Sequence, residues 1–197
     1  MPNPAPAQLV LASTSRYRRD LLARLNIPFE VAAPNVDETP LAAEAPIALA
    51  TRLAIAKAGA VRQAWPDALI IGSDQVAVVG DVILHKPGNF DNAVAQLKLM
   101  RGKPVHFHTA LCLLNSRSGR QQTALVPVIV HMREYSDAQL ERYLRAEEPY
   151  DCAGSARIEG LGITLVEKLA GDDPNALIGL PLIALCEMLL EEGMKLP

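Results

Sequence analysis

The stretch of residues 69–79 constrains the fold more than any other part of the chain. Residues 69–71 and 76–79 are apolar and rich in β-branched side chains, as in strands that are buried on both faces of a sheet. Between them the sequence reads Gly-Ser-Asp-Gln, which predicts a break between two strands. A buried carboxylate is unfavourable without a partner. Asp74 therefore either bonds the backbone of a local turn or lies at a sheet end to bind metal or activate water.

The composition narrows the class of protein. The chain has 197 residues, half of them hydrophobic, and a net charge of -3. This length predicts a single domain over residues 1–197, with residues 1–7 as a frayed extension. The mild acidity argues against a nucleic-acid partner. The lack of an apolar run of ~18–20 residues argues against a membrane partner. Three widely spaced cysteines without a Cys-x-x-Cys pair fit a reducing compartment, so we expect a cytoplasmic protein.

Strand-like and helix-like segments alternate along the first part of the chain, and a long hairpin follows. The periodicity predicts further strands at residues 9–12, 29–32, 82–84 (continuing the second central strand), 105–114, 123–132 and 164–169. It predicts a helix from the Ser-Thr-Ser turn to residue 25 and others at residues 46–64, 91–101 (capped by Asp91), 136–148 and 181–190. This order predicts an α/β fold with a mixed sheet flanked by helices.

The turn after the first predicted strand concentrates hydroxyl and guanidinium groups. Residues 13–19 read Ser-Thr-Ser-Arg-Tyr-Arg-Arg. A helix N-terminus presents unpaired N–H groups and partial positive charge, so it favours anions. Arginines in a first turn oppose the helix dipole, which suggests that they face phosphate. A solvated basic helix face is the alternative. The segment is not a Walker loop, because it lacks the glycines and the terminal Lys-Ser/Thr.

Two lysines and three acids complete the set of candidate site residues. Lys57 interrupts an apolar helix face, and Lys86 follows a predicted strand. Either could be an ordinary surface lysine. Asp37, Glu38 and Asp74 lie on predicted loops beside strand ends. Carboxylates that hold a divalent cation, together with cations that hold phosphate oxygens, indicate Mg²⁺-dependent action on a phosphorylated substrate.

Taken in order, these motifs resemble the Maf family of nucleotide pyrophosphatases. The resemblance runs from Gln8 to Glu192 and rests on residues 13–22, 36–39, 56–58, 72–76, 86–87, 152–155, 159–162 and 173–181. It implies an elongated mixed sheet with two lobes and a central cleft, as in inosine-triphosphatase-like folds. Arg16 departs from the family pattern, which usually has Pro there to preset the first helical turn. Whether Arg16 contacts phosphate is left open.

The resemblance also implies a role for each candidate residue. Asp74 would be the catalytic carboxylate that activates water, and Glu38 would bind with it a divalent cation, Mg²⁺, Mn²⁺ or Co²⁺. Catalytic Lys57 and Lys86 would grip the triphosphate. The implied substrate-binding residues are Ser13, Ser15, Arg18, Tyr17, Gln75 and Glu159. A homodimer is implied by the resemblance alone.

The branch that the chain resembles has Gln after the key Asp and an aromatic residue in the opening motif, and it acts on 7-methyl-GTP. A methylated, cationic guanine would stack on Tyr17, and Glu159 would accept from its edge and offset its charge. Without the resemblance, Tyr17 would be a packing aromatic and Glu159 a surface acid. The expected reaction is hydrolysis of a nucleoside triphosphate to the monophosphate and pyrophosphate. The alternatives are a dTTP/UTP pyrophosphatase acting on modified pyrimidines, and a nucleotide-binding regulator of cell division without significant turnover.

Overall fold

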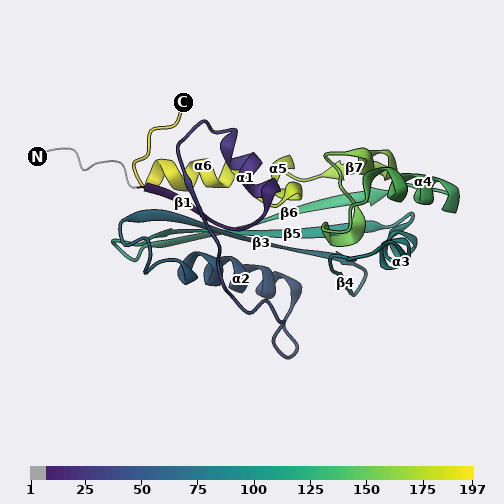
Figure 1. Ribbon diagram of the computed structural model, residues 1–197, viewed down its shortest axis with the longest axis horizontal. Coiled ribbons are helices and arrows are strands. Elements are labelled where there is room, and N and C mark those ends of the chain that lie inside the picture. Colours follow the sequence, from purple (N-terminus) through teal and green to yellow (C-terminus); the bar gives the residue numbers. More distant parts are fainter. Residues whose placement is uncertain (1–7) are drawn as a thin grey trace, which may run out of the picture. The chain divides into compact units, whose positions relative to one another are not determined.

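The computed structural model describes residues 8–197 (Figure 1). The prediction for residues 1–7 lies outside the described part of the chain. The strands are β1 (Gln8–Ala12), β2 (Glu30–Ala32), β3 (Ala68–Val79), β4 (Val82–Leu84), β5 (Pro104–Asn115), β6 (Gln121–Met132) and β7 (Val166–Ala170). The α-helices are α1 (Arg16–Ala23), α2 (Pro46–Ala60), α3 (Phe90–Met100), α4 (Asp137–Glu147), α5 (Pro174–Ile178) and α6 (Leu182–Glu191). There are also two 3₁₀ helices, η1 (Ala153–Ser155) and η2 (Leu161–Leu165), and η2 takes up the first two residues of the strand predicted at residues 164–169.

The strands form one mixed sheet, as predicted. Its order is β2-β1-β3-β5-β6-β7, and β4 pairs with β3 outside this path. β1 runs parallel to both β2 and β3, whereas β3–β4 and β6–β7 are antiparallel. The α/β class with a mixed sheet flanked by helices is thereby confirmed.

The chain separates into two compact units. Within the described part of the chain, the first comprises residues 8–75, 109–126 and 173–197, and the second comprises residues 76–108 and 127–172. The long strands β3, β5 and β6 each contribute residues to both units. The single domain and the central cleft between lobes stay predictions.

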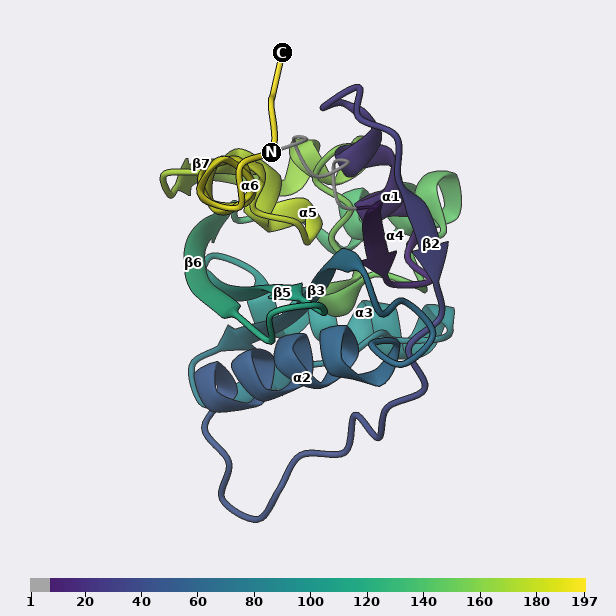
Figure 2. The same ribbon diagram turned by 90° about the vertical axis from the view of Figure 1, so that its left-hand side faces the viewer.

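Helices cover both faces of the sheet in the first unit (Figures 1 and 2). Figure 2 shows α2 on one face and α1, α5 and α6 on the other. Because side chains alternate along a strand, one face of β1 and β3 packs with α1 and α6, and the opposite face meets α2. The core on the α1 and α6 side includes Leu9, Leu11, Leu22, Leu69, Ile71, Leu111, Leu185 and Leu189.

The predicted break within residues 72–75 is wrong. β3 is one continuous strand, buried along its length except at half-buried Gln75. A Cβ at Gly72 would lie 2.1 Å from the carbonyl oxygen of Ala54 and 2.7 Å from the backbone nitrogen of Ala58. This glycine therefore lets α2 approach the strand closely, instead of ending the strand. Residues 82–84 do not continue β3 either, because β4 turns back after Gly80 and pairs antiparallel with it.

Local signals at the helix ends are largely confirmed. The Ser15 side chain accepts from the Arg18 backbone N–H, which makes Ser15 the N-cap of α1. Ser136 opens α4 with a capping box. The predicted cap at Asp91 is wrong, because Asn89 caps α3 and accepts from the Asn92 N–H at 2.9 Å.

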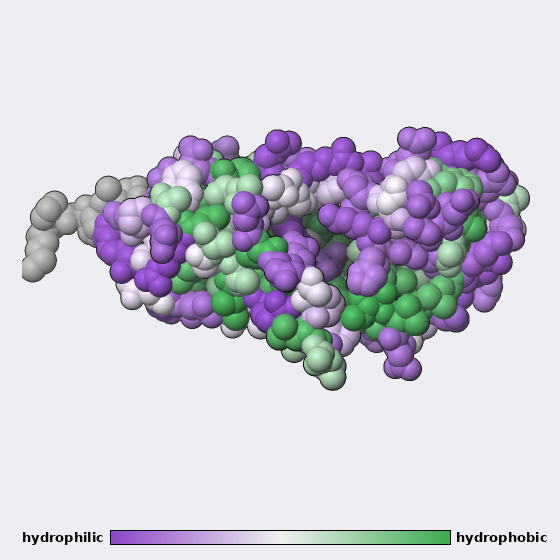
Figure 3. Space-filling model, turned by 60° about the horizontal axis from the view of Figure 1, so that its bottom comes forward, coloured by the Kyte–Doolittle hydropathy of each residue, from purple (hydrophilic) through white to green (hydrophobic). Residues whose placement is uncertain are grey.

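The surface fits a protein whose large apolar side chains are mostly internal. The face drawn in Figure 3 carries hydrophilic side chains over most of its area, with hydrophobic ones in separate patches. Among residues 8–197, no helix combines the length and the apolar character that crossing a membrane would require.

Candidate active site

The strand β3 places Asp74 beside the carboxyl end of a parallel strand. Its pairing with β1 reaches Ile71, and its pairing with β4 starts at Ala77. Asp74 lies on β3 between the residues that form these two ladders. Crevices beside the carboxyl ends of parallel strands are the usual ligand sites of open α/β sheets.

Lys57 of α2 joins the two predicted metal-binding acids. Its Nζ donates to Oδ1 of Asp74 at 2.6 Å and lies 2.7 Å from Oε1 of Glu38. The side chains of Lys57 and Asp74 are 8% and 10% exposed, whereas that of Glu38 is 61% exposed. The Gly72 contact with α2 makes the buried pair feasible, because it brings the helix that carries Lys57 against the strand that carries Asp74. The group therefore has a buried end and a solvent-facing end.

Burial dominates the electrostatics of this group. Withdrawal from water raises the pKa of Asp74, and the Glu38 charge raises it further, while Lys57 and Arg18 act in the opposite direction. Desolvation also lowers the pKa of Arg18 from its ordinary value, although the charges of Asp74 and Glu38 oppose that change. Four of the residues named from the sequence are thus coupled in one site, and Asp74 is a stronger base than an ordinary carboxylate.

The turn between β1 and α1 positions Arg18. Oγ of Ser13 accepts from the Ser15 N–H at 3.1 Å, and Ser15 in turn caps the helix. Nε of Arg18 donates to the carbonyl oxygen of Gly179 at 2.8 Å. Oγ of buried Ser73 lies 2.9 Å from the same carbonyl oxygen and 2.8 Å from that of Ala110. These bonds hold Arg18 against the segment that follows α5.

Gln75 faces away from Asp74, because consecutive strand residues point to opposite faces. Its Nε2 lies 2.9 Å from Oγ1 of Thr109, 2.9 Å from the Ala176 carbonyl oxygen and 3.0 Å from that of Leu177. The amide N–H groups of Gln75 thus tie β3 to α5 and β5. Its predicted reading of the base stays a prediction, and the amide oxygen is the group that could serve it.

Arg16 contacts the predicted stacking residue. Its guanidinium carbon lies 4.7 Å from the centroid of the Tyr17 ring, and its Nη2 donates to the Tyr17 hydroxyl at 2.7 Å. The arginine that replaces the usual proline therefore covers part of this ring. Its contact with phosphate stays open.

Comparison with known proteins shows which family this chain belongs to. The profile of the family described as Maf-like protein matches residues 8–192. The chain belongs to the Maf family. It is 61% identical over 186 residues to a protein of Thiobacillus denitrificans named 7-methyl-GTP pyrophosphatase, covering 94% of this chain and 92% of that protein. A protein with the same name in Nitrosospira multiformis is 57% identical, over 96% of this chain and 96% of that protein. Another, in Nitrosococcus oceani, is 53% identical, over 98% of this chain and 97% of that protein.

Two predicted site residues of this Maf chain, Lys86 and Glu159, belong to the second unit. Lys86 is exposed after β4, and Oε1 of Glu159 lies 3.4 Å from Nε of Arg157. A hydrogen-bonded network supports both segments. The backbone N–H of Gly154 donates to the carbonyl oxygen of His85 at 3.3 Å. The Gln96 side chain also donates to the His85 carbonyl oxygen and accepts from the Ser155 hydroxyl. The Tyr143 hydroxyl donates to the Ser155 carbonyl oxygen and accepts from the Arg157 backbone N–H, and the Arg157 side chain donates to Glu147. Their participation in the Lys57 site stays a prediction.

The donor set around Lys57 fits a magnesium-like cation bound together with phosphate. Glu38 and Asp74 place carboxylate oxygens around one point, which the Lys57 ammonium occupies. Magnesium commonly takes one or two protein carboxylates and completes its shell with water and substrate phosphate. Among residues 8–197, no group of three or more His, Cys, Asp or Glu side chains is arranged to hold a metal by itself. Glu38 and Asp74 therefore offer two carboxylates to a divalent cation, and the binding of such a cation stays a prediction.

Sequence reasoning missed the residues that support this site. Arg52 and Glu44 anchor the loop that carries Glu38, and Ser73 and Thr109 bond the segment around α5. Ser73 and Thr109 are fully buried polar residues within strands. The available signal was that Ser73 lies between two apolar runs and that Thr109 directly precedes one, because buried hydroxyls need partners.

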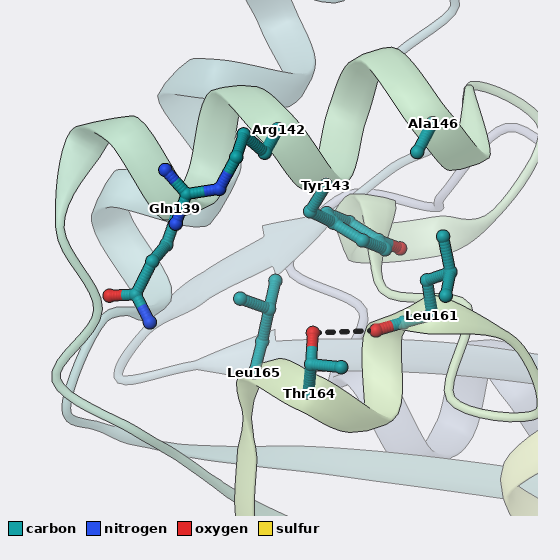
Figure 4. Close-up of a pocket in the computed structure, with 7 residues that line it drawn as sticks. All are labelled: Gln139, Arg142, Tyr143, Ala146, Leu161, Thr164 and Leu165. Atoms are coloured by element: carbon teal, nitrogen blue, oxygen red, sulfur yellow. Dashed lines mark hydrogen bonds between the residues drawn. The ribbon is translucent and has the colours of Figure 1, made fainter.

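A separate pocket of about 280 Å³ lies in the second unit, between α4 and η2 (Figure 4). It is lined by Gln139, Arg142, Tyr143, Ala146, Leu161, Thr164 and Leu165. The hydroxyl of Thr164 donates to the carbonyl oxygen of Leu161 at 2.8 Å. This lining contains no carboxylate and none of the predicted site residues, so it does not offer the chemistry of the Lys57 group.

Proposed function

We propose that this Maf chain hydrolyses 7-methyl-GTP to 7-methyl-GMP and pyrophosphate. The observation that carries the proposal is the buried Lys57–Asp74 pair with Glu38 at its solvent-facing end. The names of the relatives, which are 53–61% identical over nearly their full length, support 7-methyl-GTP as the substrate. Such an enzyme would fit the cytoplasm, with no nucleic-acid or membrane partner, and a homodimer is part of the proposal.

Asp74 is the proposed general base. A carboxylate whose pKa is raised by burial takes a proton from water more readily than an exposed one. The water oxygen attacks the α-phosphorus, the bond from that phosphorus to the bridging oxygen breaks, and pyrophosphate leaves. Lys57 and Arg18 lie near enough to Asp74 to affect its pKa, so they can offset charge that develops on the phosphate oxygens. Lys86 would serve the same purpose on the β- and γ-phosphates.

Glu38 and Asp74 would hold the divalent cation, Mg²⁺ or Mn²⁺, with Co²⁺ as a third candidate. When bound, such a cation neutralises phosphate charge and lowers the pKa of coordinated water. The Glu38 carboxylate suits this task because it lies beside Lys57 and is largely exposed, so that a cation can reach it from solvent. The hydroxyls of Ser13 and Ser15 and the start of α1 would receive the anionic end of the substrate.

Recognition of the methylated base is proposed for Tyr17, Glu159 and Gln75. The guanidinium of Arg16 lies over the Tyr17 ring, and a cationic base would make the same type of contact, which supports this assignment. Glu159 would accept from the guanine edge. Gln75 would contribute its amide oxygen.

A panel of triphosphates tests the proposal. Pyrophosphate release is measured for 7-methyl-GTP, GTP, dTTP and UTP, with Mg²⁺, Mn²⁺, Co²⁺ or EDTA. We expect turnover to be highest with 7-methyl-GTP, to require metal and to disappear in Asp74→Asn. Asp67→Asn serves as the matched control, because Asp67 is an exposed acid paired with Arg117.

Three results would overturn the proposal. Preference for dTTP or UTP would point to the pyrimidine-directed alternative. Nucleotide binding without turnover would favour a regulator of cell division. Full activity in Asp74→Asn would remove the assigned base.

A further inference from the structure

The loop of residues 33–45 carries Glu38 from β2 to α2. Glu38 is largely exposed, and the loop around it is exposed along most of its length. An exposed loop would by itself leave a metal-binding carboxylate poorly placed. The described contacts show that α2 holds this loop at two separate points.

The first point is the ion pair of Glu38 with Lys57. The second is Arg52, which lies on the same helix five positions earlier, about 7.5 Å along the helix axis. Nη2 of Arg52 donates to the carbonyl oxygen of Thr39, the residue next to Glu38, at 3.1 Å. The loop is therefore fixed to α2 immediately beside Glu38.

Glu44 completes this anchor. Nε and Nη2 of Arg52 bond its two carboxylate oxygens at 2.6 and 2.8 Å, which is a bidentate arrangement. The Leu41 N–H donates to Oε2 of Glu44 at 2.9 Å, and the Glu44 side chain is 8% exposed. The hydrogen bonds from Arg52 and Leu41 lower the pKa of Glu44 to about 2, so the anchor stays ionised at any pH relevant to turnover.

We propose that Arg52 and Glu44 are positioning residues, which set the Glu38 carboxylate against Lys57 so that it can share a divalent cation with Asp74. This inference rests on the proposed function and adds residues that it does not use. Arg52 acts through the loop and touches no reacting atom. A lysine could keep the charge but could not bond Glu44 through two nitrogens and Thr39 at once.

The test compares Arg52→Lys and Glu44→Gln with the wild type. Arg145→Lys is the matched control, because Arg145 also makes a two-nitrogen contact with a glutamate, Glu141, on the surface of α4. Hydrogen exchange of the backbone N–H groups within residues 37–41, where Pro40 has none, reports whether the loop is anchored. Mn²⁺ affinity, measured by EPR on the free protein, reports whether the carboxylates are in place without requiring turnover. Pyrophosphate release then separates kcat from KM.

We expect faster exchange at residues 37–41 and a 10–100-fold loss of Mn²⁺ affinity in both variants, with kcat falling more than KM rises. The charge exchange Arg52→Glu with Glu44→Arg should recover part of both losses. Arg145→Lys should match the wild type.

Unchanged exchange, or faster exchange with unchanged Mn²⁺ affinity, would overturn the inference. Failure of the wild type to bind Mn²⁺ would overturn it as well. A wild type that binds Mn²⁺ but lacks turnover would refute the proposed function, while the exchange and affinity results would still decide the role of Arg52.

Discussion

Removing the Asp74 carboxylate should destabilise the fold far more than removing that of Glu38, although both bond the same ammonium. The two distances to Nζ of Lys57 are nearly equal, 2.6 Å from Asp74 and 2.7 Å from Glu38. Burial is what separates them. Lys57 and Asp74 are both almost inaccessible to water, whereas Glu38 is mostly solvated.

The expected magnitudes follow from this difference. Breaking a buried ion pair by removing one partner typically destabilises by ~3–5 kcal/mol, and an exposed pair contributes ~0–1 kcal/mol. Glu38 would remain as a partner for Lys57, and the desolvation that raises the pKa of Asp74 offsets part of the energy of the pair. We therefore expect Asp74→Asn to lower the free energy of unfolding by no more than about 3 kcal/mol, the low end of this range. In a chain of this length that lowers Tm by about 6–12 °C. Glu38→Gln should lower Tm by less than about 4 °C.

We would measure urea and thermal unfolding of Asp74→Asn, Glu38→Gln, Lys57→Met and the double variant that combines Lys57→Met with Asp74→Asn. The double variant contains no unpaired buried charge, so it should be more stable than the sum of its two single losses implies. Equal destabilisation by Asp74→Asn and Glu38→Gln, or additive losses in the double variant, would refute the reasoning.

Three further predictions follow from the site. Gly72→Ala should push α2 away from β3, because the added Cβ would overlap the Ala54 carbonyl oxygen. We expect the free energy of unfolding, measured in urea, to fall by about 1–3 kcal/mol. A Gly72→Ala variant with wild-type stability would contradict the close packing. Glu159→Ala should lower kcat/KM at least ~10-fold more for 7-methyl-GTP than for UTP, since a charged hydrogen bond to the base is lost; equal losses would mean that Glu159 does not read the base. Because burial raises the pKa of Asp74 above 3.8, kcat/KM should fall with decreasing pH through a pKa higher than that value. Over the same window the native state binds more protons than the unfolded one, so the stability of the wild type relative to Asp74→Asn should decrease as pH rises. An acid limb at or below 3.8 would exclude Asp74 as the group that titrates.

Elements specified by neighbouring residues could be predicted from the sequence. Ser15 and Ser136 cap their helices because the hydroxyl and the N–H groups that it accepts from lie within three residues. The mixed sheet could be predicted because apolar periodicity changes where the hairpin of β5 and β6 begins. These signals depend on residues that are close in the sequence, so the packing of distant segments changes the resulting elements little.

Features that depend on packing could not be predicted. Residues 72–75 have the composition of a turn, yet each has a tertiary reason to stay in the strand. Gly72 admits α2, Asp74 pairs with Lys57, and Ser73 and Gln75 bond carbonyl groups around α5. The sequence indicated what the acids and lysines could do chemically, but it did not indicate that Lys57 pairs with Asp74 and Glu38. The Arg52–Glu44 anchor was missed because its function depends on the path of a loop without periodicity.

The position of water attack tests the central claim most directly. Wild-type enzyme is supplied with 7-methyl-GTP and metal in ¹⁸O-labelled water, and the products are analysed by mass spectrometry. Water activated by Asp74 and directed at the α-phosphorus places the label in 7-methyl-GMP and leaves pyrophosphate unlabelled. Label in pyrophosphate or in orthophosphate would show attack at another phosphorus and would contradict the assigned chemistry.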